Sequence, residues 1–384
     1  MGTILLIRQH FNWPGTTPNE DQHLIPSTSD EEEGPKIVGN NKQKRIKKNI
    51  WWRFLNIKNW KIWRSSKKPK TLEELLQNRS FSEFVPPKMK NTGNDCYAIV
   101  VMHSLFSCQP VVEFILQKYQ AQKNGDPEDI DDLSRIVYKC MVNYFTDEMF
   151  EVTDLIKELN FNREQQDACE FLRKLMNNYF GQSMFEISTT GTSGCLHCDS
   201  GINQIDTNVI LTLHIETARN TDVTIEKLLK QHFENEEQYE AACSSCNKDK
   251  ATFRRVSTSL RTPMPPIICV AVSPFYVVKG GKASTLERVE KPIEIGDTFD
   301  FSKYVAGTTD EKYEYEAVSV VHHFGVSENS GHYAANVTKQ GKHYACNDDI
   351  VKTANNRNDC GEGGLPYLIV YKLLTPDNPE ALSE

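Results

Sequence analysis

The stretch Asn91-Thr-Gly-Asn-Asp-Cys96-Tyr97 decides the fold, and it continues directly into an apolar run over residues 97–106. A glycine-bearing turn followed by a run without helix breakers predicts a helix that begins near Cys96. A cysteine at a helix start faces unpaired backbone N–H groups and the positive end of the helix dipole, and both favour the thiolate. Cys96 is therefore a candidate nucleophile, and a structural cysteine is the alternative.

A histidine and an asparagine that could assist such a thiolate lie far downstream. Ser330-Gly-His332-Tyr333 opens a strand-like segment, and His343-Tyr-Ala-Cys-Asn347-Asp348 follows it. A thiol, a distant histidine base and an Asn or Asp that orients the imidazole make up the Cys–His–Asn form of nucleophilic catalysis. The order of the three residues fits this chemistry, although their spacing alone leaves a structural role open for each.

Two Cys-x-x-Cys pairs form a second chemical feature. They are Cys195-Leu-His-Cys198 and Cys243-Ser-Ser-Cys246, with 44 residues between them. Four thiolates suit tetrahedral Zn²⁺ and leave no open position for water, so the predicted zinc is structural. The long insert indicates that the metal joins the ends of two β-hairpins. Four unrelated cysteines are the alternative.

The hydrophobic period changes from helical to strand-like along the chain. Helical spacing predicts one helix from Asp126 to about Tyr144 and another from Ala168 to about Tyr179. Alternation over residues 205–215 predicts one half-buried strand. Further strand-like runs cover residues 267–278, 315–323, 333–337 and 367–374. Helices followed by strands predict an α+β fold.

Charge and composition divide the chain into two parts. Residues 1–70 contain all five tryptophans and 14 Lys/Arg against 6 Asp/Glu, a net charge of +8. Residues 71–384 contain all eleven cysteines and have a net charge of −16. The chain has no run of 18 or more apolar residues, so the sequence predicts no membrane span. The N-terminus does not have the pattern of a signal peptide. An odd number of cysteines without an export signal predicts an intracellular, reducing compartment, cytoplasm or nucleus.

The N-terminal part is expected to be mostly disordered over residues 1–70, since it cannot bury enough apolar surface to offset its ordering entropy. A capping box, Thr71-Leu-Glu-Glu74, predicts a short helical lead-in over residues 71–86. Residues 42–70 hold twelve basic residues, no acidic ones, and interleaved aromatics. Such a segment can bind nucleic acid, an anionic membrane or an import receptor, or can be a solvated linker.

The motifs together resemble the ubiquitin-specific proteases, a family of papain-like cysteine deubiquitinases. The resemblance covers about residues 87–374, in order, and implies a papain-like fold with thumb, palm and zinc-bearing β fingers. The fingers would span about residues 188–262, and residues 375–384 would be a disordered tail. The supporting motifs are the stretch around Cys96, Gln165-Gln-Asp-Ala-Cys-Glu-Phe-Leu172, Val320-Val-His-His-Phe-Gly325, Gly331-His-Tyr333, Asn347-Asp348 and Tyr367-Leu-Ile-Val-Tyr371.

The same resemblance implies a role for each matching residue. The implied catalytic residues are the nucleophile Cys96, the base His332, the third triad member Asn347, the acidic neighbour Asp348 and the oxyanion-hole donor Asn91. The implied substrate-channel residues are Gln165, Asp167, His323 and Tyr333, with Asp167 expected to pair with an arginine of the ubiquitin tail. The implied zinc ligands are Cys195, Cys198, Cys243 and Cys246.

The function implied by the resemblance is hydrolysis of the isopeptide or peptide bond after the C-terminal glycine of ubiquitin, through a thioester. Ubiquitin and ubiquitinated proteins are then the partners, and a domain of net charge −16 suits the basic tail of ubiquitin. Asp95 departs from the family, which has Thr or Ser there, and places a negative charge beside the thiol. A weak or inactive ubiquitin-binding module and a protease of a ubiquitin-like modifier are therefore the alternatives. The oligomeric state is left open.

Overall fold

The computed structural model describes most of the chain beyond residue 83. The described residues are 84–125, 130–146, 149–181, 184–215, 223–234, 236–273, 275–280, 283–288, 293–307, 311–327, 330–359 and 361–374. All of them belong to one compact unit, Lys67–Glu384. The predicted tails at 1–70 and 375–384 lie outside the described residues. The predicted helical lead-in also lies outside them up to residue 83, and residues 84–86 are not helical.

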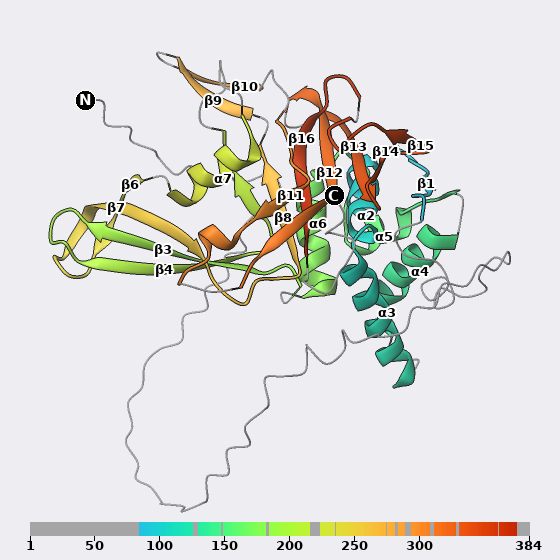
Figure 1. The fold of residues 1–384 in the computed structure, drawn as a ribbon, viewed down its shortest axis with the longest axis horizontal. Helices are drawn as coiled ribbons and strands as arrows, with labels where there is room; N and C mark the ends of the chain where they lie inside the picture. Colours follow the sequence, from blue (N-terminus) through green and yellow to red (C-terminus); the bar gives the residue numbers. More distant parts are fainter. Residues whose placement is uncertain are drawn as a thin grey trace, which may run out of the picture. The chain divides into compact units, whose positions relative to one another are not determined.

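Helices dominate the first half of the described chain (Figure 1). They are α2 (Cys96–Phe106), α3 (Gln109–Asn124), α4 (Asp132–Thr146), α5 (Thr153–Glu158) and α6 (Ala168–Leu175), which continues as the π-helix η4 (Met176–Phe180). Two short parallel strands, β1 (Lys88–Met89) and β2 (Met149–Phe150), lie among them. No single described helix is long and apolar enough to cross a membrane; α2 and α3 pass that test only as a pair bent by 91°.

The second half is mostly strands, which confirms the α+β prediction. One large sheet has the order β15–β14–β13–β12–β16–β8–β5, and β11 pairs with β12. Its strands are β5 (Leu211–Leu213), β8 (Ile267–Val272), β11 (Thr298–Asp300), β12 (Glu314–Ser327), β13 (Ser330–Lys339), β14 (Lys342–Asn347), β15 (Ile350–Ala354) and β16 (Leu365–Leu373). Helix α7 (Ile225–Glu234), the 3-10 turn η5 (Ser302–Tyr304) and the hairpin β9 (Phe275–Gly280) to β10 (Ala283–Arg288) complete this part.

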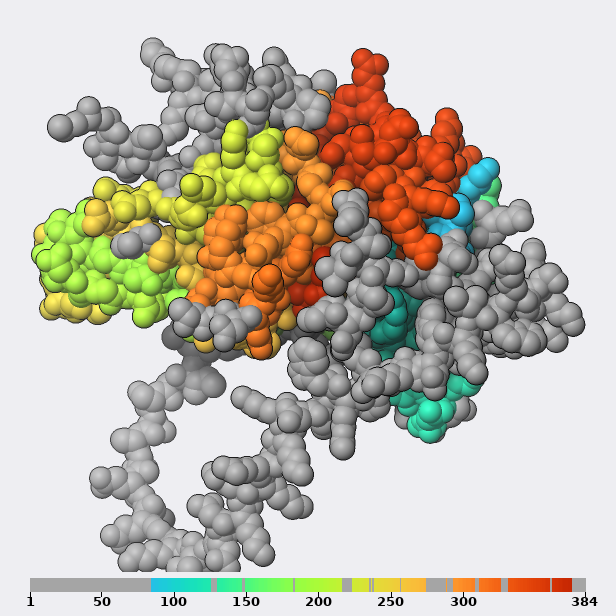
Figure 2. Space-filling view, viewed as in Figure 1, coloured from blue at the N-terminus to red at the C-terminus, as the bar shows by residue number. Residues whose placement is uncertain are grey.

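A separate four-stranded sheet, here called the fingers sheet, has the order β4–β3–β7–β6. Its strands are β3 (Ile187–Cys195), β4 (Gly201–Asn208), β6 (Glu237–Cys243) and β7 (Lys248–Leu260). In the space-filling view its yellow-green surface lies beside the orange strands (Figure 2). The sheet begins and ends close to the predicted limits of 188 and 262, but the segment between β4 and β6 leaves it to form β5 and α7.

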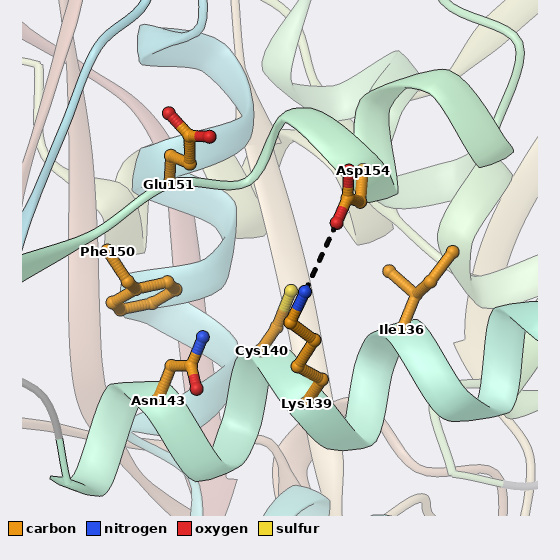
Figure 3. A pocket seen from close by; sticks show the side chains of 7 residues that line it. All are labelled: Ile136, Lys139, Cys140, Asn143, Phe150, Glu151 and Asp154. Atoms are coloured by element: carbon orange, nitrogen blue, oxygen red, sulfur yellow. Dashed lines mark hydrogen bonds and ion pairs between the residues drawn. The ribbon is translucent and has the colours of Figure 1, made fainter.

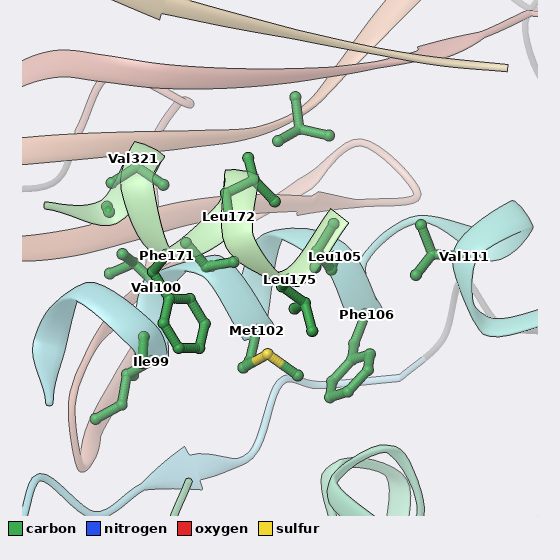
Figure 4. Packing of buried hydrophobic residues seen from close by; sticks show 14 of the residues in the cluster. Ile99, Val100, Met102, Leu105, Phe106, Val111, Phe171, Leu172, Leu175 and Val321 are labelled. Atoms are coloured by element: carbon green, nitrogen blue, oxygen red, sulfur yellow. The ribbon is translucent and has the colours of Figure 1, made fainter. Parts of the chain in front are cut away.

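Helix α2 is buried on every side. All eleven of its residues are buried, as expected for a helix that is apolar all round. It packs against β12, β13 and β14 of the large sheet and against α6. Its apolar side chains meet those of α6 (Figure 4). Its buried Ser104 hydroxyl is satisfied by the Val100 carbonyl and by the Ser319 hydroxyl of β12, each at 2.8 Å. The helix that begins with the candidate nucleophile is therefore fixed between sheet and helices.

The large sheet is buried on both faces. On β8, Cys269 packs in the core with α2, whereas Ile268 and Val270 pack in a second core. Leu229 of α7 belongs to that second core. Apolar residues in succession, rather than in alternation, are the expected pattern of a strand covered on two sides. This double burial makes the sheet a rigid support for the loops at its edges.

The prediction of a single half-buried strand over residues 205–215 was wrong. The run divides into β4 and β5, which belong to different sheets. Ile205 on β4 is 57% exposed, whereas Leu211 and Leu213 on β5 are buried. Apolar and polar residues continue to alternate without a shift between β4 and β5. The two-residue period therefore could not reveal that the chain leaves one sheet for another near Val209. The run 267–278 similarly contains two strands, β8 and β9.

The predicted helices are confirmed, with shifted ends. The helix expected from Asp126 begins at Asp132, after Asp131 accepts the backbone N–H of Ser134 at 2.8 Å; residues 126–129 lie outside the described residues. The helix expected over 168–179 continues after Leu175 as the wider π-helix η4. Helix α3 was not predicted, because most of its apolar residues lie in one run over residues 111–116 instead of recurring at helical spacing.

We predict that Phe171→Ala destabilises the domain strongly. Phe171 is fully buried on α6 and meets the Tyr97 ring edge-on at a centroid distance of 5.5 Å. Truncating a buried Phe costs about 3–5 kcal/mol through lost burial and the cavity left behind. Urea unfolding should show this loss, while Ile205→Ala on the exposed β4 should change the unfolding free energy by less than about 0.5 kcal/mol. Equal effects of the two variants would contradict the described core.

Candidate active site

Three residues from distant parts of the chain meet at one edge of the large sheet. Cys96 is the first residue of α2, and His332 lies near the start of β13. Asn347 ends β14, whose antiparallel pairing with β13 brings it to the same edge. The His332 Nε2 atom lies 2.7 Å from Asn347 Oδ1, and Cys96 is close enough to His332 to be the main cause of its raised pKa. The structure thus brings together the three residues of the predicted triad.

The proton of the site resides on His332. Cys96 is the largest influence on the pKa of His332, which rises to about 9 against the opposing effect of burial. Since Nε2 faces Asn347, the other ring nitrogen, Nδ1, serves Cys96. The neighbouring His323 behaves in the opposite way, because burial, Arg288 and His332 lower the pKa of His323 to about 4. Near neutral pH, therefore, the imidazolium is at His332 and not at His323.

The Asn91 side chain organises the loop ahead of Cys96. Its Oδ1 atom accepts the backbone N–H groups of Gly93 and Asp95, at 3.0 Å and 3.1 Å. Its Nδ2 atom donates to Asp348 Oδ2 at 3.0 Å. Asp348 has the left-handed backbone (φ +51°) of the tight turn between β14 and β15. An amide nitrogen carries two hydrogens, so one donor of Asn91 remains for an oxyanion.

The Asp95 carboxylate is not the bare charge that the sequence predicted. Asp95 is only 4% exposed, and its Oδ2 atom accepts both the N–H and the hydroxyl of Thr92, at 3.0 Å and 2.6 Å. It makes no side-chain hydrogen bond to the N-terminus of α2. The charge beside the nucleophile is therefore partly compensated by Thr92, which the sequence analysis had not selected.

Three of the predicted substrate-channel residues gather beside the triad, together with one that was missed. Asp167 caps α6 by accepting the Glu170 N–H at 2.8 Å, and it also accepts the hydroxyls of Tyr333 and Tyr367. His323 packs on both tyrosine rings, at centroid distances of 5.0 Å and 5.8 Å. Burial raises the pKa of Asp167. Its carboxylate is thus engaged within the protein, where an external arginine was expected.

The fourth predicted channel residue, Gln165, is half-buried in the loop that leads into α6. Tyr367 was missed as a site residue because its motif reads as part of a core strand. Tyr367 lies two strands away from Tyr333 in the large sheet, and no local signal in the sequence indicates that the two are close.

Arg288 and two glycines, also missed, hold the ends of the strands around this cluster. The Arg288 guanidinium donates to the carbonyls of His323 and Gly363, at 3.1 Å and 2.8 Å. At Gly331 a Cβ would lie 2.3 Å from the His323 ring, and at Gly364 one would lie 2.5 Å from the Phe324 ring. Both positions therefore require glycine for close approach. The residue before His332 is small because the imidazole of His323 occupies the space.

The four predicted zinc ligands converge at the tip of the fingers sheet. The Sγ atoms of Cys195, Cys198, Cys243 and Cys246 all lie within 4.8 Å of one another. The Cys198 and Cys243 sulfurs are 3.7 Å apart, far beyond a disulfide bond. A tetrahedron with Zn–S bonds of about 2.3 Å has edges of about 3.8 Å, so this donor set fits zinc.

The two Cys-x-x-Cys turns have the same construction. Cys195 ends β3 and Cys243 ends β6, and each pair is followed by a residue in the left-handed region, Asp199 (φ +55°) and Asn247 (φ +52°). Asp and Asn tolerate this conformation better than other non-glycine residues. Two equivalent hairpin tips therefore face one another across the β3–β7 pairing.

A pocket on the helical side of the molecule holds a further cysteine (Figure 3). It is lined by residues of α4, β2 and α5, among them Cys140, Phe150 and Glu151. An ion pair between Lys139 and Asp154, at 3.3 Å, crosses it. Burial raises the pKa of Cys140 to about 12, so this thiol is protonated and unreactive near neutral pH. None of the triad residues lines the pocket, and Cys140 is excluded as a nucleophile.

Comparison with known proteins agrees with this arrangement. A family model described as ubiquitin carboxyl-terminal hydrolase matches residues 88–371. Ubiquitin carboxyl-terminal hydrolase 16 of Arabidopsis thaliana is 23% identical over 329 residues, which are 77% of this chain and 31% of the relative. Ubiquitin carboxyl-terminal hydrolase 25 of Arabidopsis thaliana is 25% identical over 305 residues, 69% of this chain and 44% of the relative. The chain thus spans less than half the length of these two relatives.

A solved structure shares the fold. It is the SAGA Ubp8/Sgf11/Sus1/Sgf73 DUB module bound to ubiquitin aldehyde, with a TM-score of 0.56 and 18% identity over 76% of this chain and 72% of that chain. This shared fold and the meeting of Cys96, His332 and Asn347 at one sheet edge agree with the family match. Because the family model covers most of it, this chain belongs to the ubiquitin carboxyl-terminal hydrolase family.

We predict that Cys96→Ala lowers the pKa of His332, because it removes the largest influence that raises it. In the unmodified protein the imidazole keeps its proton until the pH approaches about 9. In the variant it loses the proton at a lower pH, since burial then has less opposition. An NMR titration of the His332 ring measures this, with His343 as the internal control. Identical midpoints would show that the two side chains are not coupled.

Proposed function

We propose that this protein is a thiol-dependent deubiquitinase that cleaves the bond after the C-terminal glycine of ubiquitin. The observation that carries the proposal is the Cys96–His332–Asn347 arrangement, with the proton on His332 and the thiol at the start of a buried helix. The family match over residues 88–371 supports ubiquitin as the substrate. The ubiquitin aldehyde bound in the similar DUB module is in line with it.

In the proposed reaction, Cys96 and His332 carry out the first half. The Cys96 thiolate attacks the carbonyl carbon of the terminal glycine, and a tetrahedral oxyanion forms. The imidazolium of His332, oriented by Asn347, then donates its proton to the leaving lysine amine, and the C–N bond breaks. A thioester between ubiquitin and Cys96 remains. In the second half, neutral His332 takes a proton from water, which attacks the thioester and frees Cys96.

The oxyanion would be held by the remaining Asn91 donor and by backbone N–H groups at the start of α2. Asn91 is fixed by three hydrogen bonds, so its amide needs no reorganisation when charge develops. One such preorganised donor contributes about 3–4 kcal/mol of transition-state stabilisation in comparable sites.

A single comparison tests the proposal. Cys96→Ala should reduce the hydrolysis of a ubiquitin–fluorophore conjugate by about 10³-fold or more, since the nucleophile is lost. Cys140→Ala is the matched control, because this buried thiol is unreactive, and it should keep most of the activity. A protein that binds ubiquitin with no difference in hydrolysis between wild type and Cys96→Ala would be an inactive binding module instead. If the protein cleaved only a conjugate of a ubiquitin-like modifier and not the ubiquitin conjugate, that modifier would be its substrate.

We further propose that Cys195, Cys198, Cys243 and Cys246 bind one structural Zn²⁺. The sulfur spacing supports this, and so do the two matched hairpin tips. Bound there, zinc would cross-link two hairpins whose local core is very small. That core consists of Cys195, Cys243, Ala251 and Phe253, with Tyr239, Ala241 and Cys246 packed against it.

Metal analysis tests the zinc site. Freshly purified protein should contain about one zinc per chain, and Cys243→Ser should lose it and unfold at a lower temperature. Ser245→Ala, which lies between two ligands but offers no thiolate, is the control and should retain the metal. Equal zinc content in Cys243→Ser and wild type would exclude the site.

The cellular location and the partners of residues 42–70 remain predictions, because that segment lies outside the described residues. We propose an intracellular location, in keeping with ten described cysteines that are all free of disulfide bonds. Nucleic acid, an anionic membrane and an import receptor are the candidate partners of the basic segment. Imaging the protein with and without residues 1–70 separates a targeting segment from a solvated linker.

A further inference from the structure

A short chain of hydroxyl groups ends on the residue before the nucleophile. The Thr92 hydroxyl lies 2.6 Å from Asp95 Oδ2 and 3.3 Å from the Thr153 hydroxyl. Because a carboxylate only accepts, Thr92 donates to Asp95, which leaves its oxygen free to accept from Thr153. The Asp95 charge affects its surroundings. Burial is the largest cause of the raised pKa of Tyr97, and the Asp95 charge is the second. Thr92 therefore holds a buried anion on the residue that precedes the nucleophile.

The same anion lies next to the backbone donors of α2. The Asp95 carbonyl accepts the N–H groups of Ala98 and Ile99, both at 3.0 Å, so the helical hydrogen bonds start here. The N–H groups of Cys96 and Tyr97 belong to the first turn of the helix. They have no helical carbonyl acceptor, because no turn of α2 precedes them. A carboxylate at a helix start is normally drawn to such groups. Asp95 makes no bond of this kind and points to Thr92 instead.

We propose that Thr92 is a positioning residue that keeps the Asp95 carboxylate away from the oxyanion-binding N–H groups beside Cys96. The inference rests on the proposed function, because those groups matter only if an oxyanion forms there. Without the Thr92 hydroxyl, Asp95 Oδ2 keeps only the Thr92 N–H at 3.0 Å, and the N–H groups of Cys96 and Tyr97 become competing donors for the carboxylate. A carboxylate on them would occupy the oxyanion position and repel the developing charge.

This role differs from simple stiffening of the loop in one measurable way. If Thr92 only stiffens the loop, its removal costs the same activity whatever residue stands at 95. If Thr92 diverts a negative charge, its removal is harmful only while residue 95 is an acid. The two roles are separated by a double-mutant cycle between positions 92 and 95.

The kinetic test uses ubiquitin–fluorophore hydrolysis by the full chain. Thr92→Val, which keeps the shape of the side chain, should lower kcat about tenfold and change KM less than twofold, as for loss of one hydrogen bond to a charged group. Thr92→Ser keeps the hydroxyl and should restore activity. In an Asp95→Thr background, Thr92→Val should cost less than twofold. An equal loss in both backgrounds would overturn the proposal.

A second measurement does not depend on catalysis. With ¹⁵N-labelled Cys and Tyr, the amide protons of Cys96 and Tyr97 should move downfield in Thr92→Val, because each gains a charged acceptor. They should return in the double variant Thr92→Val/Asp95→Thr. Unmoved amide signals would overturn the inference even in an active enzyme. If the wild type hydrolyses no more conjugate than Cys96→Ala, the proposed function fails, while these signals still decide where Asp95 points.

Discussion

The burial of α2 between the large sheet and α6 is the constraint on which the rest of the structure depends. Its eleven residues are all buried, so the helix can neither rotate nor slide without exposing apolar surface or clashing. Cys96, its first residue, is consequently fixed relative to His332 on β13. A reactive pair needs such precision, because a small displacement of a nucleophile from its base costs much of the rate.

Around Cys96 and His332, each of three carboxylates accepts hydrogen bonds from neighbouring side chains. Asn91 donates to Asp348, Thr92 to Asp95, and two tyrosines to Asp167. Each carboxylate would otherwise be a buried anion, which is costly without a partner. The arrangement also gives the two neighbouring histidines opposite pKa shifts, because the pKa of His332 is raised and that of His323 is lowered. In the proposed reaction, the acid–base role thereby belongs to His332 alone.

The fold class, the meeting of Cys96, His332 and Asn347, and the cluster of four cysteines could be predicted, because each rests on local pattern, on residue type or on the family resemblance. The run at 205–215 could not be resolved, because β4 and β5 keep one alternation while they join different sheets. Arg288 and Tyr367 were missed for a related reason. Arg288 contacts Gly363, and Tyr367 contacts Asp167. Each contact joins segments far apart in sequence, so no regular spacing of residues indicates it.

Residue types and local pattern already identify the groups that are available: a thiol at a helix start, a histidine and an asparagine near strand ends, and two Cys-x-x-Cys turns. These follow from periodicity and from the chemistry of single side chains. The tertiary structure alone decided the direction in which each polar group points. Asp95 appears in the sequence as a charge beside the nucleophile, yet packing places the Thr92 hydroxyl 2.6 Å from its carboxylate. Hydrogen bonds depend on distance and angle, which only the folded chain sets.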